Sequence, residues 1–506
     1  MVKRISLMLF AFLLVLPLQT FAGSLGKGEP STNPGEWFVG PTPSYIDPNK
    51  APIVFVHGLN SSSSTWRDNN DMDEVAYQNG YETAFINLYP TKNMWDNGQL
   101  LATKLREIYN HFGGKKLVVV AHSKGGLDTQ SALVHYNAHT YVKRVITLGS
   151  PHHGSQVANL AYSSWAGWMA SLLGSKNDAT FSLQTSYMTN FRNETDSHAN
   201  ARKVPFYTLA GTKWGSFGSA LYWGGLYLSQ YGQNDGLVTV ASSRLPYGTE
   251  LRVGSWNHTT IKEGSSTFSI FAPYLRLNST DAVSKIERKQ EEKMISAYYR
   301  GGNYQQSVKE TFFVEDGVNE MTVDWMSERE KSNLTLVDPN GKEYSTFTTA
   351  EDATDVFQGS YHHMINIQNP AAGPWTIVAN NEKEHYFLSV IFDSATNHSL
   401  DVEVKTDKDI QVIFNEKNQL LNKAGLSATV QVEFMDMKAN QVKRLKAAAN
   451  DLSNALTINS LGEGIYNITI DIQGKTISGK EFNRTIIQSV YVPATNTTRT
   501  GMGLFN

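Results

Sequence analysis

A single serine lies between an apolar run and a helix-like pattern in residues 117–136, which read LVVVAHSKGGLDTQSALVHY. Ser123 has two small residues, Ala121 and Gly125, two positions away on either side of it. A strand, a tight turn with small neighbours and a helix together raise such a hydroxyl above the end of a sheet. Because a serine hydroxyl alone is a poor nucleophile, the site also needs a base, a carboxylate that orients the base, and donors for an oxyanion. This pattern predicts nucleophilic catalysis by Ser123.

Donors for the oxyanion are predicted after an earlier apolar run, in residues 53–64, which read IVFVHGLNSSSS. His57 and Gly58 end this run, and a turn at the end of a strand can direct backbone N–H groups into such a site. We expect the N–H of Leu59 and the N–H of Lys124, the residue after the serine, to point at the oxyanion. Lys124 would serve through its backbone. An ordinary strand-ending turn is the alternative interpretation of His57 and Gly58.

The order of serine, acid and histidine along the chain guides the choice of the other two residues. Asp235 stands between asparagine and glycine ahead of an apolar run, in GQNDGLVTVASS. His258 follows a short strand-like run, in VGSWNHTTIKEG. We therefore predict Asp235 as the orienting acid and His258 as the base, although Asp-Gly is also a common plain turn. His198 comes before Asp235, which is too early for this order, and we expect it at the surface.

Two segments that are rich in aromatic and small residues follow the serine, at residues 157–174 and 214–232. In the first segment the apolar residues recur at roughly helical spacing. We expect the two segments to form a mobile apolar cover over Ser123 that lines the path of the substrate. The alternative is a helix that simply packs on the sheet. The aromatic residues expected to contact substrate are Trp165, Trp168, Trp214, Phe217 and Trp223.

The composition is that of a globular protein without a polyanionic partner. The 506 residues carry a formal net charge of −3, and the basic residues are scattered, so no electrostatic footprint for nucleic acid is visible. The chain has no cysteine, which excludes disulfides, thiolate catalysis and cysteine-based metal sites. We expect no cofactor and no required metal ion.

The first residues are organised like a secretory signal peptide. Lys3 and Arg4 precede an apolar run, and small residues follow at Ala22 and Gly23. We expect cleavage after Ala22 and an extracellular, bacterial protein. A membrane anchor is the alternative, but the apolar run is well short of the roughly 20 residues that a membrane span requires.

The rest of the chain divides into an α/β region and two all-β regions. Short continuous apolar runs alternate with helix-like segments up to about Leu277, which predicts a mostly parallel sheet with helices on both faces. Beyond a charged segment, apolar residues recur with a period of two, which predicts two β-sandwiches. The expected division is a signal peptide at 1–22, an α/β domain at 23–280, a linker at 281–295, a β-sandwich at 296–399 and an immunoglobulin-like sandwich at 400–506.

Four motifs in residues 51–277 together resemble those of the secreted bacterial lipases and esterases of the α/β-hydrolase superfamily. The motifs are Ala-His-Ser-Lys-Gly-Gly, Val-His-Gly-Leu, Ser150-Pro-His-His-Gly154 and Asn234-Asp-Gly-Leu-Val238, in the order of the family. The resemblance covers about half of the chain. It implies ester hydrolysis in which Ser123 is the nucleophile, Asp235 the orienting acid and His258 the general base. It also implies that His152 and His153 are structural loop residues.

The resemblance favours a lipase that acts on acylglycerols at a lipid interface through an acyl-enzyme. A short-chain carboxylesterase, a polyester depolymerase and an acyltransferase remain alternatives, since fold and triad do not determine the substrate. A non-catalytic surface-binding protein on a hydrolase scaffold is the alternative from another class. The C-terminal sandwiches would bind substrate or cell wall, or serve as spacers.

Overall fold

The computed structural model describes residues 33–280 and 294–494, except for 353, 355, 407–408, 438–441 and 451. The predicted signal peptide and most of the predicted linker, residues 281–293, therefore lie outside the described residues. Among the described residues, no helix combines the length and the apolar character that a membrane span requires.

The first domain is built on a seven-stranded sheet with the order β1-β3-β2-β4-β5-β6-β7. Every neighbouring pair is parallel except β1 with β3. The central strands are apolar and buried along their whole length, as parallel strands covered on both faces must be. The strands are β1 (Trp37–Val39), β2 (Ile53–Val56), β3 (Thr83–Ile86), β4 (Leu117–His122), β5 (Val142–Leu148), β6 (Phe206–Gly211) and β7 (Thr249–Gly254).

Helices cover both faces of this sheet, because successive side chains of a strand point to opposite sides. Val54 and Val56 of β2 pack with α2 and α3 on one face, whereas Ile53 and Phe55 pack with α1 and α10 on the other. The predicted α/β architecture is confirmed. The helices are α1 (Met72–Gln78), α2 (Met94–His111), α3 (Gly125–His135), α4 (Gln156–Ala161), α5 (Gly167–Leu172), α6 (Asp178–Ser182), α7 (Thr185–Asp196), α8 (Ala220–Ser229), α9 (Val240–Ser243) and α10 (Gly264–Phe271).

The second domain is a sandwich of a five-stranded and a four-stranded antiparallel sheet, with the orders β13-β14-β10-β16-β8 and β12-β11-β15-β9. Residues of both sheets share one apolar core. Its strands are β8 (Ala297–Tyr304), β9 (Val308–Val314), β10 (Glu320–Ser327), β11 (Leu334–Val337), β12 (Glu343–Tyr344), β13 (Thr348–Glu351), β14 (Tyr361–Gln368), β15 (Gly373–Ala379) and β16 (Glu384–Asp393).

The third domain pairs a three-stranded sheet, β17-β18-β21, with a four-stranded sheet, β20-β19-β22-β23, around another shared core. The two all-β regions predicted from the period of two are therefore confirmed as sandwiches. The strands are β17 (Leu400–Thr406), β18 (Ile410–Glu416), β19 (Ser427–Met435), β20 (Val442–Ala449), β21 (Leu456–Ile458), β22 (Gly464–Lys475) and β23 (Glu481–Val492). Short 3-10 helices lie at Ser63–Trp66, Ala138–Thr140, Thr260–Lys262, Ala272–Leu275, Ala395–His398 and Lys423–Gly425.

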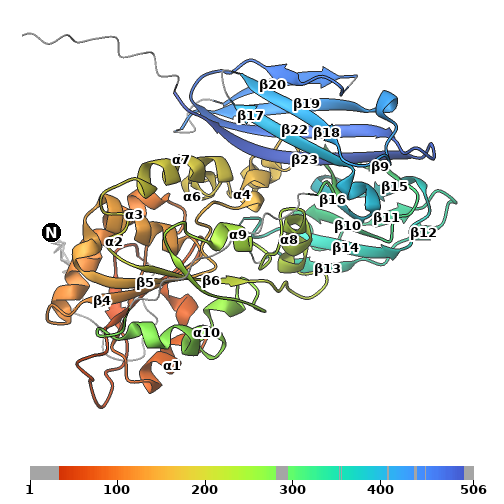
Figure 1. The fold of residues 1–506 in the computed structure, drawn as a ribbon. Helices are drawn as coiled ribbons and strands as arrows, with labels where there is room; N and C mark the ends of the chain where they lie inside the picture. The colour runs from red at the N-terminus through yellow and green to blue at the C-terminus, as the bar shows by residue number, and fades with distance from the viewer. Residues whose placement is uncertain are drawn as a thin grey trace, which may run out of the picture.

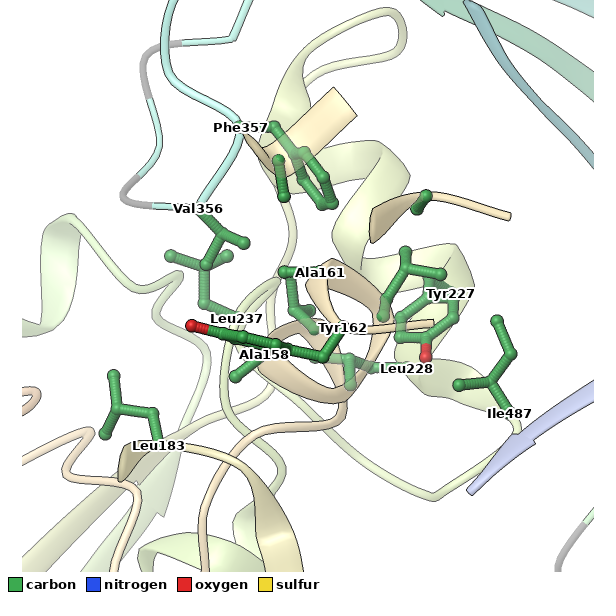
Figure 2. Packing of buried hydrophobic residues seen from close by; sticks show 14 of the residues in the cluster. Ala158, Ala161, Tyr162, Leu183, Tyr227, Leu228, Leu237, Val356, Phe357 and Ile487 are labelled. Carbon is green, nitrogen blue, oxygen red and sulfur yellow. The ribbon is translucent and has the colours of Figure 1, made fainter. Parts of the chain in front are cut away.

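Both sandwiches lie against the side of the α/β domain that carries α4, α5, α7 and α8 (Figure 1). One buried apolar cluster runs through all three domains. It joins Leu59 and Leu237 of the α/β domain to Val356 and Phe357 of the first sandwich and Ile487 of the second. Figure 2 shows Val356 and Phe357 above the α/β domain and Ile487 at its flank. The interface is thus a continuation of the core.

A buried ionic cluster supports the segment that carries Val356 and Phe357, between β13 and β14. The imidazole of His362 contacts Oδ2 of Asp324 through Nδ1 at 2.9 Å and Oδ2 of Asp352 through Nε2 at 3.2 Å. Burial lowers the pKa of His362, but the two carboxylates overcome this effect and raise the pKa to about 10. A charged imidazolium that donates to both carboxylates therefore joins the start and the end of the segment to β10.

We predict a pH-dependent loss of stability in the variant His362→Gln. Because the pKa of His362 is higher in the folded state, its stabilisation is fully present below the ordinary value of 6.5 and is lost as the pH rises toward about 10. Breaking a buried pair costs about 3–5 kcal/mol. The unfolding free energy of the variant should therefore fall below that of the wild type at pH 6, and the difference should shrink by pH 10.

The exposed His198 offers a matched control, since His198→Gln should leave the unfolding free energy nearly unchanged at both pH values. A difference between His362→Gln and the wild type that stays constant from pH 6 to pH 10 would contradict the ionic interpretation.

Candidate active site

Ser123 occupies a strained turn between β4 and α3. Its φ is +52°, in the left-handed region that non-glycine residues rarely adopt, and its N–H donates to the carbonyl of Leu148 at 3.0 Å. A Cβ on Gly125 would lie 2.4 Å from the carbonyl oxygen of His57, so only glycine fits there. Ala121, at the position where the general G-x-S-x-G nucleophile elbow has glycine, is accommodated as a fully buried small side chain. The turn holds the Ser123 hydroxyl at the carboxyl end of the sheet.

His258 and Asp235 complete a hydrogen-bonded chain with Ser123. Nε2 of His258 lies 3.0 Å from Oγ of Ser123, and Nδ1 lies 2.8 Å from Oδ2 of Asp235. The other carboxylate oxygen of Asp235 accepts the N–H groups of Leu237 and Val238, at 3.0 and 2.8 Å. With Nδ1–H donated to the carboxylate, Nε2 is left to accept the serine proton. The structure therefore brings together the three residues that the chain order singled out.

Both backbone polar groups of His258 are held by hydrogen bonds. Its N–H donates to the carbonyl of Asp235 at 2.9 Å, and its carbonyl accepts from Nε2 of His122 at 2.8 Å. Burial lowers the pKa of His122 well below its ordinary value, so this imidazole is neutral. The residue before the serine thus positions the candidate base, a role that the sequence did not reveal.

Residues 57–60, here called the oxyanion loop, pass close to the serine at Gly58. A Cβ on Gly58 would lie 2.9 Å from Cβ of Ser123, so the loop passes directly over the nucleophile. Nδ1 of His57 donates to the carbonyl of Gly58 at 2.8 Å, and Nε2 accepts the N–H of Leu88 at 2.9 Å. Burial lowers the pKa of His57 to about 4 and keeps it neutral. Because C=O and N–H of a trans peptide point in opposite directions, the N–H of Leu59 points away from the His57 ring.

Lys124 is the second predicted donor, and its backbone lies at the first turn of α3. Within the described part of the chain, neither its N–H nor that of Leu59 donates a hydrogen bond to a backbone carbonyl. The side chain of Lys124 is fully buried, which was not expected, and Nζ lies 2.7 Å from Oδ1 of Asp128. The spacing of four residues between a lysine and an acid on one helix was the available signal.

Two of the predicted substrate-contacting aromatics lie at the interface with the sandwiches. Nε1 of Trp165 donates to the carboxylate of Asp471 on β22 at 3.2 Å. The ring of Trp168 stacks on His385 of β16, with ring centroids 5.3 Å apart. Direct contact of these residues with substrate stays a prediction, because in the full chain they hold the domains together.

The remaining three aromatics lie on or near α8. Trp223 is buried, and its Nε1 donates to Oγ of Ser389 on β16 at 2.9 Å. Trp214 and Phe217 pack edge-on against the ring of Tyr222, and Phe217 is exposed. The predicted apolar cover therefore consists of short helices whose outer face the sandwiches occupy.

The histidines that were set aside lie away from the triad. His198 is exposed, and its ring lies 5.2 Å from that of His135. His152 is buried, and its Nε2 contacts Oγ1 of Thr147 at 3.4 Å. The N–H of His153 is held by the carbonyl of Ser242 at 3.3 Å. These contacts are those of structural loop residues.

Ser123 and His258 are almost completely buried in the full chain, and residues of the first sandwich lie near the site. Only 5% of Ser123 and 4% of His258 are exposed. Phe357 of the first sandwich packs edge-on against Trp223, with ring centroids 5.9 Å apart, and Gln358 lines the same surface pocket as Asn60 of the oxyanion loop. Local patterns along the chain do not indicate these contacts, because Phe357 and Gln358 lie more than two hundred residues from the serine in another domain.

Comparisons with known proteins agree with this architecture. Residues 92–164 match the family model described as a PGAP1-like alpha/beta domain. No curated protein matches the chain. The structure of Bacillus licheniformis lipase BlEst2 in its propeptide form is 44% identical, covers 91% of this chain and 98% of its own, and superposes with a TM-score of 0.81.

Two further solved structures match a smaller part of the chain. The mature form of BlEst2 is 59% identical over 48% of this chain and 99% of its own, with a TM-score of 0.47. The metagenomic carboxyl esterase MGS0156 is 21% identical over 46% of this chain and 78% of its own, with a TM-score of 0.38. The likeness to the propeptide form carries the assignment, because it extends over nearly the whole of both chains. The chain therefore belongs to the same family of α/β-hydrolase lipases and esterases as the lipase BlEst2.

Proposed function

We propose that this chain is a secreted serine carboxylic-ester hydrolase that acts on acylglycerols through Ser123, His258 and Asp235. The observation that carries the proposal is the continuous hydrogen-bonded chain from the Ser123 hydroxyl through the imidazole to the buried carboxylate. Membership of a family of lipases and esterases makes the chain a carboxylic-ester hydrolase. The signal-peptide pattern of residues 1–22 supports secretion.

The geometry supports a two-step acyl transfer. Nε2 of His258 takes the proton of Ser123 as Oγ attacks the ester carbonyl, and Asp235 stabilises the imidazolium that forms. The N–H groups of Leu59 and Lys124 stabilise the oxyanion. His258 then protonates the leaving alcohol, which gives an acyl-enzyme. Water then attacks this ester with His258 as base, and His258 returns the proton to Oγ of Ser123 as the acid is released.

An apolar acyl chain suits the surroundings of the site. The α4 to α5 region and α8 contribute a cluster of alanine, leucine, tryptophan and tyrosine side chains to the core that reaches Leu59. Apolar walls with a few convergent polar groups are typical of sites for lipid-like ligands. This observation favours acylglycerols, and a short-chain carboxylesterase or a polyester depolymerase is the alternative within the same chemistry.

We also propose that the two sandwiches act as a pro-region that limits access to the site. The full chain leaves the nucleophile almost inaccessible, and Val356 and Phe357 are buried against the apolar region beside it. The BlEst2 structure that matches this chain over 98% of its own length is the propeptide form. Separation of the sandwiches would expose an apolar surface around Ser123, as a lipase that works at a lipid interface requires.

Substitution of the triad tests the catalytic assignment. Ser123→Ala should abolish hydrolysis of a soluble ester such as p-nitrophenyl acetate, with little change in thermal midpoint. Asp235→Asn and His258→Ala should each lower kcat/KM by several orders of magnitude, because only the oxyanion donors and substrate binding remain. His198→Ala is the control and should keep wild-type turnover. Near wild-type turnover of His258→Ala would refute the assignment and direct attention to His198.

Cleavage between the domains tests the pro-region. A specific protease site inserted within residues 281–293 is cut after folding, and the sandwiches are then separated from the α/β domain. We expect turnover of the soluble ester to rise at least about tenfold, because the site becomes accessible, with cleaved Ser123→Ala as the inactive control.

Three outcomes of this cleavage are distinct. Unchanged turnover on all esters would contradict the pro-region. Loss of activity on insoluble substrate alone would assign substrate binding to the sandwiches. Loss on every ester would mean that the sandwiches complete the hydrolase domain.

A further inference from the structure

A buried ion pair beside the nucleophile has no part in the triad. Both carboxylate oxygens of Asp128 lie close to Nζ of Lys124, at 2.7 and 3.0 Å, and neither side chain reaches solvent. Two charges so deeply buried carry a large desolvation cost, and hydrophobic replacements are often as stable. Because Lys124 directly follows Ser123 in the chain, this pair is a candidate for a role beyond simple stabilisation.

The ion pair continues into an amide that binds a backbone segment. Oδ2 of Asp128 accepts Nδ2–H of Asn97 at 3.0 Å. The same amide donates to the carbonyl of Tyr89 and accepts its N–H through Oδ1, both at 3.0 Å. Asn97 is buried, so these contacts exclude water. The side chain of Asn97 thus holds both backbone groups of Tyr89.

The residues on either side of Tyr89 hold the oxyanion loop at its two ends. The N–H of Leu88 donates to Nε2 of His57 at 2.9 Å, and the carbonyl of Pro90 accepts the N–H of Asn60 at 3.0 Å. Asn60 has a φ of +45°, a strained conformation that persists only where the surroundings impose it. Leu59, the predicted oxyanion donor, lies between these two anchors.

We propose that Asn97 and Asp128 are positioning residues for ester hydrolysis, which together with the Lys124 ammonium set the distance between the two oxyanion donors. One donor is the N–H of Leu59, on the loop that the segment around Tyr89 holds. The other donor is the N–H of Lys124, and the side chain of this lysine pairs with Asp128, which in turn binds Asn97. The inference rests on the proposed function, since it concerns the same site.

Such positioning matters because oxyanion stabilisation depends on preorganised hydrogen-bond donors. A donor acts when it lies about 2.7–3.1 Å from the oxyanion, and loss of one donor costs about 10²–10³ in kcat. A change in the spacing of the two donors affects the tetrahedral state more than substrate binding. Disruption of the connection should therefore lower kcat and leave KM nearly unchanged.

The test compares Asn97→Ala and the isosteric Asp128→Asn with the wild type in the full chain. We expect each variant to lower kcat for p-nitrophenyl acetate about 10- to 100-fold, with KM within about twofold. A trifluoromethyl ketone, which forms a tetrahedral adduct with the serine, should bind more weakly by a similar factor. The double variant should be no worse than the stronger single variant, because both remove one connection.

Ser131→Ala is the matched control. Ser131 is buried on the same helix as Asp128, and its Oγ has no hydrogen-bond partner within the described residues. This variant should keep kcat and ketone affinity within about twofold. The thermal midpoint of every variant is measured in parallel, and Asp128→Asn preserves the side-chain volume if Asn97→Ala folds poorly.

Two failures are distinguishable. If Asn97→Ala and Asp128→Asn lower the thermal midpoint but keep wild-type kcat and ketone affinity, the connection is only structural and the inference is wrong. If neither the full chain nor its cleaved form hydrolyses any ester, the proposed function fails and the inference with it.

Discussion

The left-handed turn at Ser123 is the constraint on which the rest of the site depends. Ser123 has a φ of +52°, a strained conformation that persists only because the surrounding backbone imposes it. The Ser123 N–H is held by Leu148, and glycine at position 125 lets α3 begin against the carbonyl of His57. The same close approach brings the oxyanion loop over the hydroxyl. Nucleophile and oxyanion donors are therefore products of one packing arrangement.

Burial assigns different charge states to the histidines of this protein. Among the described residues, no carboxylate pairs with His57 or His122, so burial lowers their pKa values and both act as neutral anchors of backbone groups. His362 is equally buried but lies between two carboxylates, which raise its pKa to about 10. The same side chain thus serves as a neutral hydrogen-bonding group in the α/β domain and as a cation in the first sandwich.

The interface between the domains and the candidate site share one apolar core. Trp165, just before α5, and Trp223 of α8 lie against β22 and β16, where their N–H groups donate to Asp471 and Ser389. Burying this surface stabilises the full chain, and the same surface suits an apolar substrate. Under the proposed function, docking of the sandwiches and binding of an acyl chain would compete for this one surface.

Local patterns in the sequence were sufficient for the architecture, and they predicted three site residues that the structure places within hydrogen-bonding distance of one another. Continuous apolar runs such as residues 117–121 predict buried parallel strands, and a period of two predicts the sandwiches, because both signals come from neighbouring residues. The elbow at Ser123 and the order of Asp235 and His258 were equally readable, since they depend on turns and on the sequence of strands. The tertiary structure alone decided the rest. The hydrogen bond from Asn97 to Asp128, the anchoring of His258 by His122 and the packing of Phe357 on Trp223 all join residues that lie on different elements. Such contacts follow from how packed elements meet in space, and no periodicity along the chain encodes them.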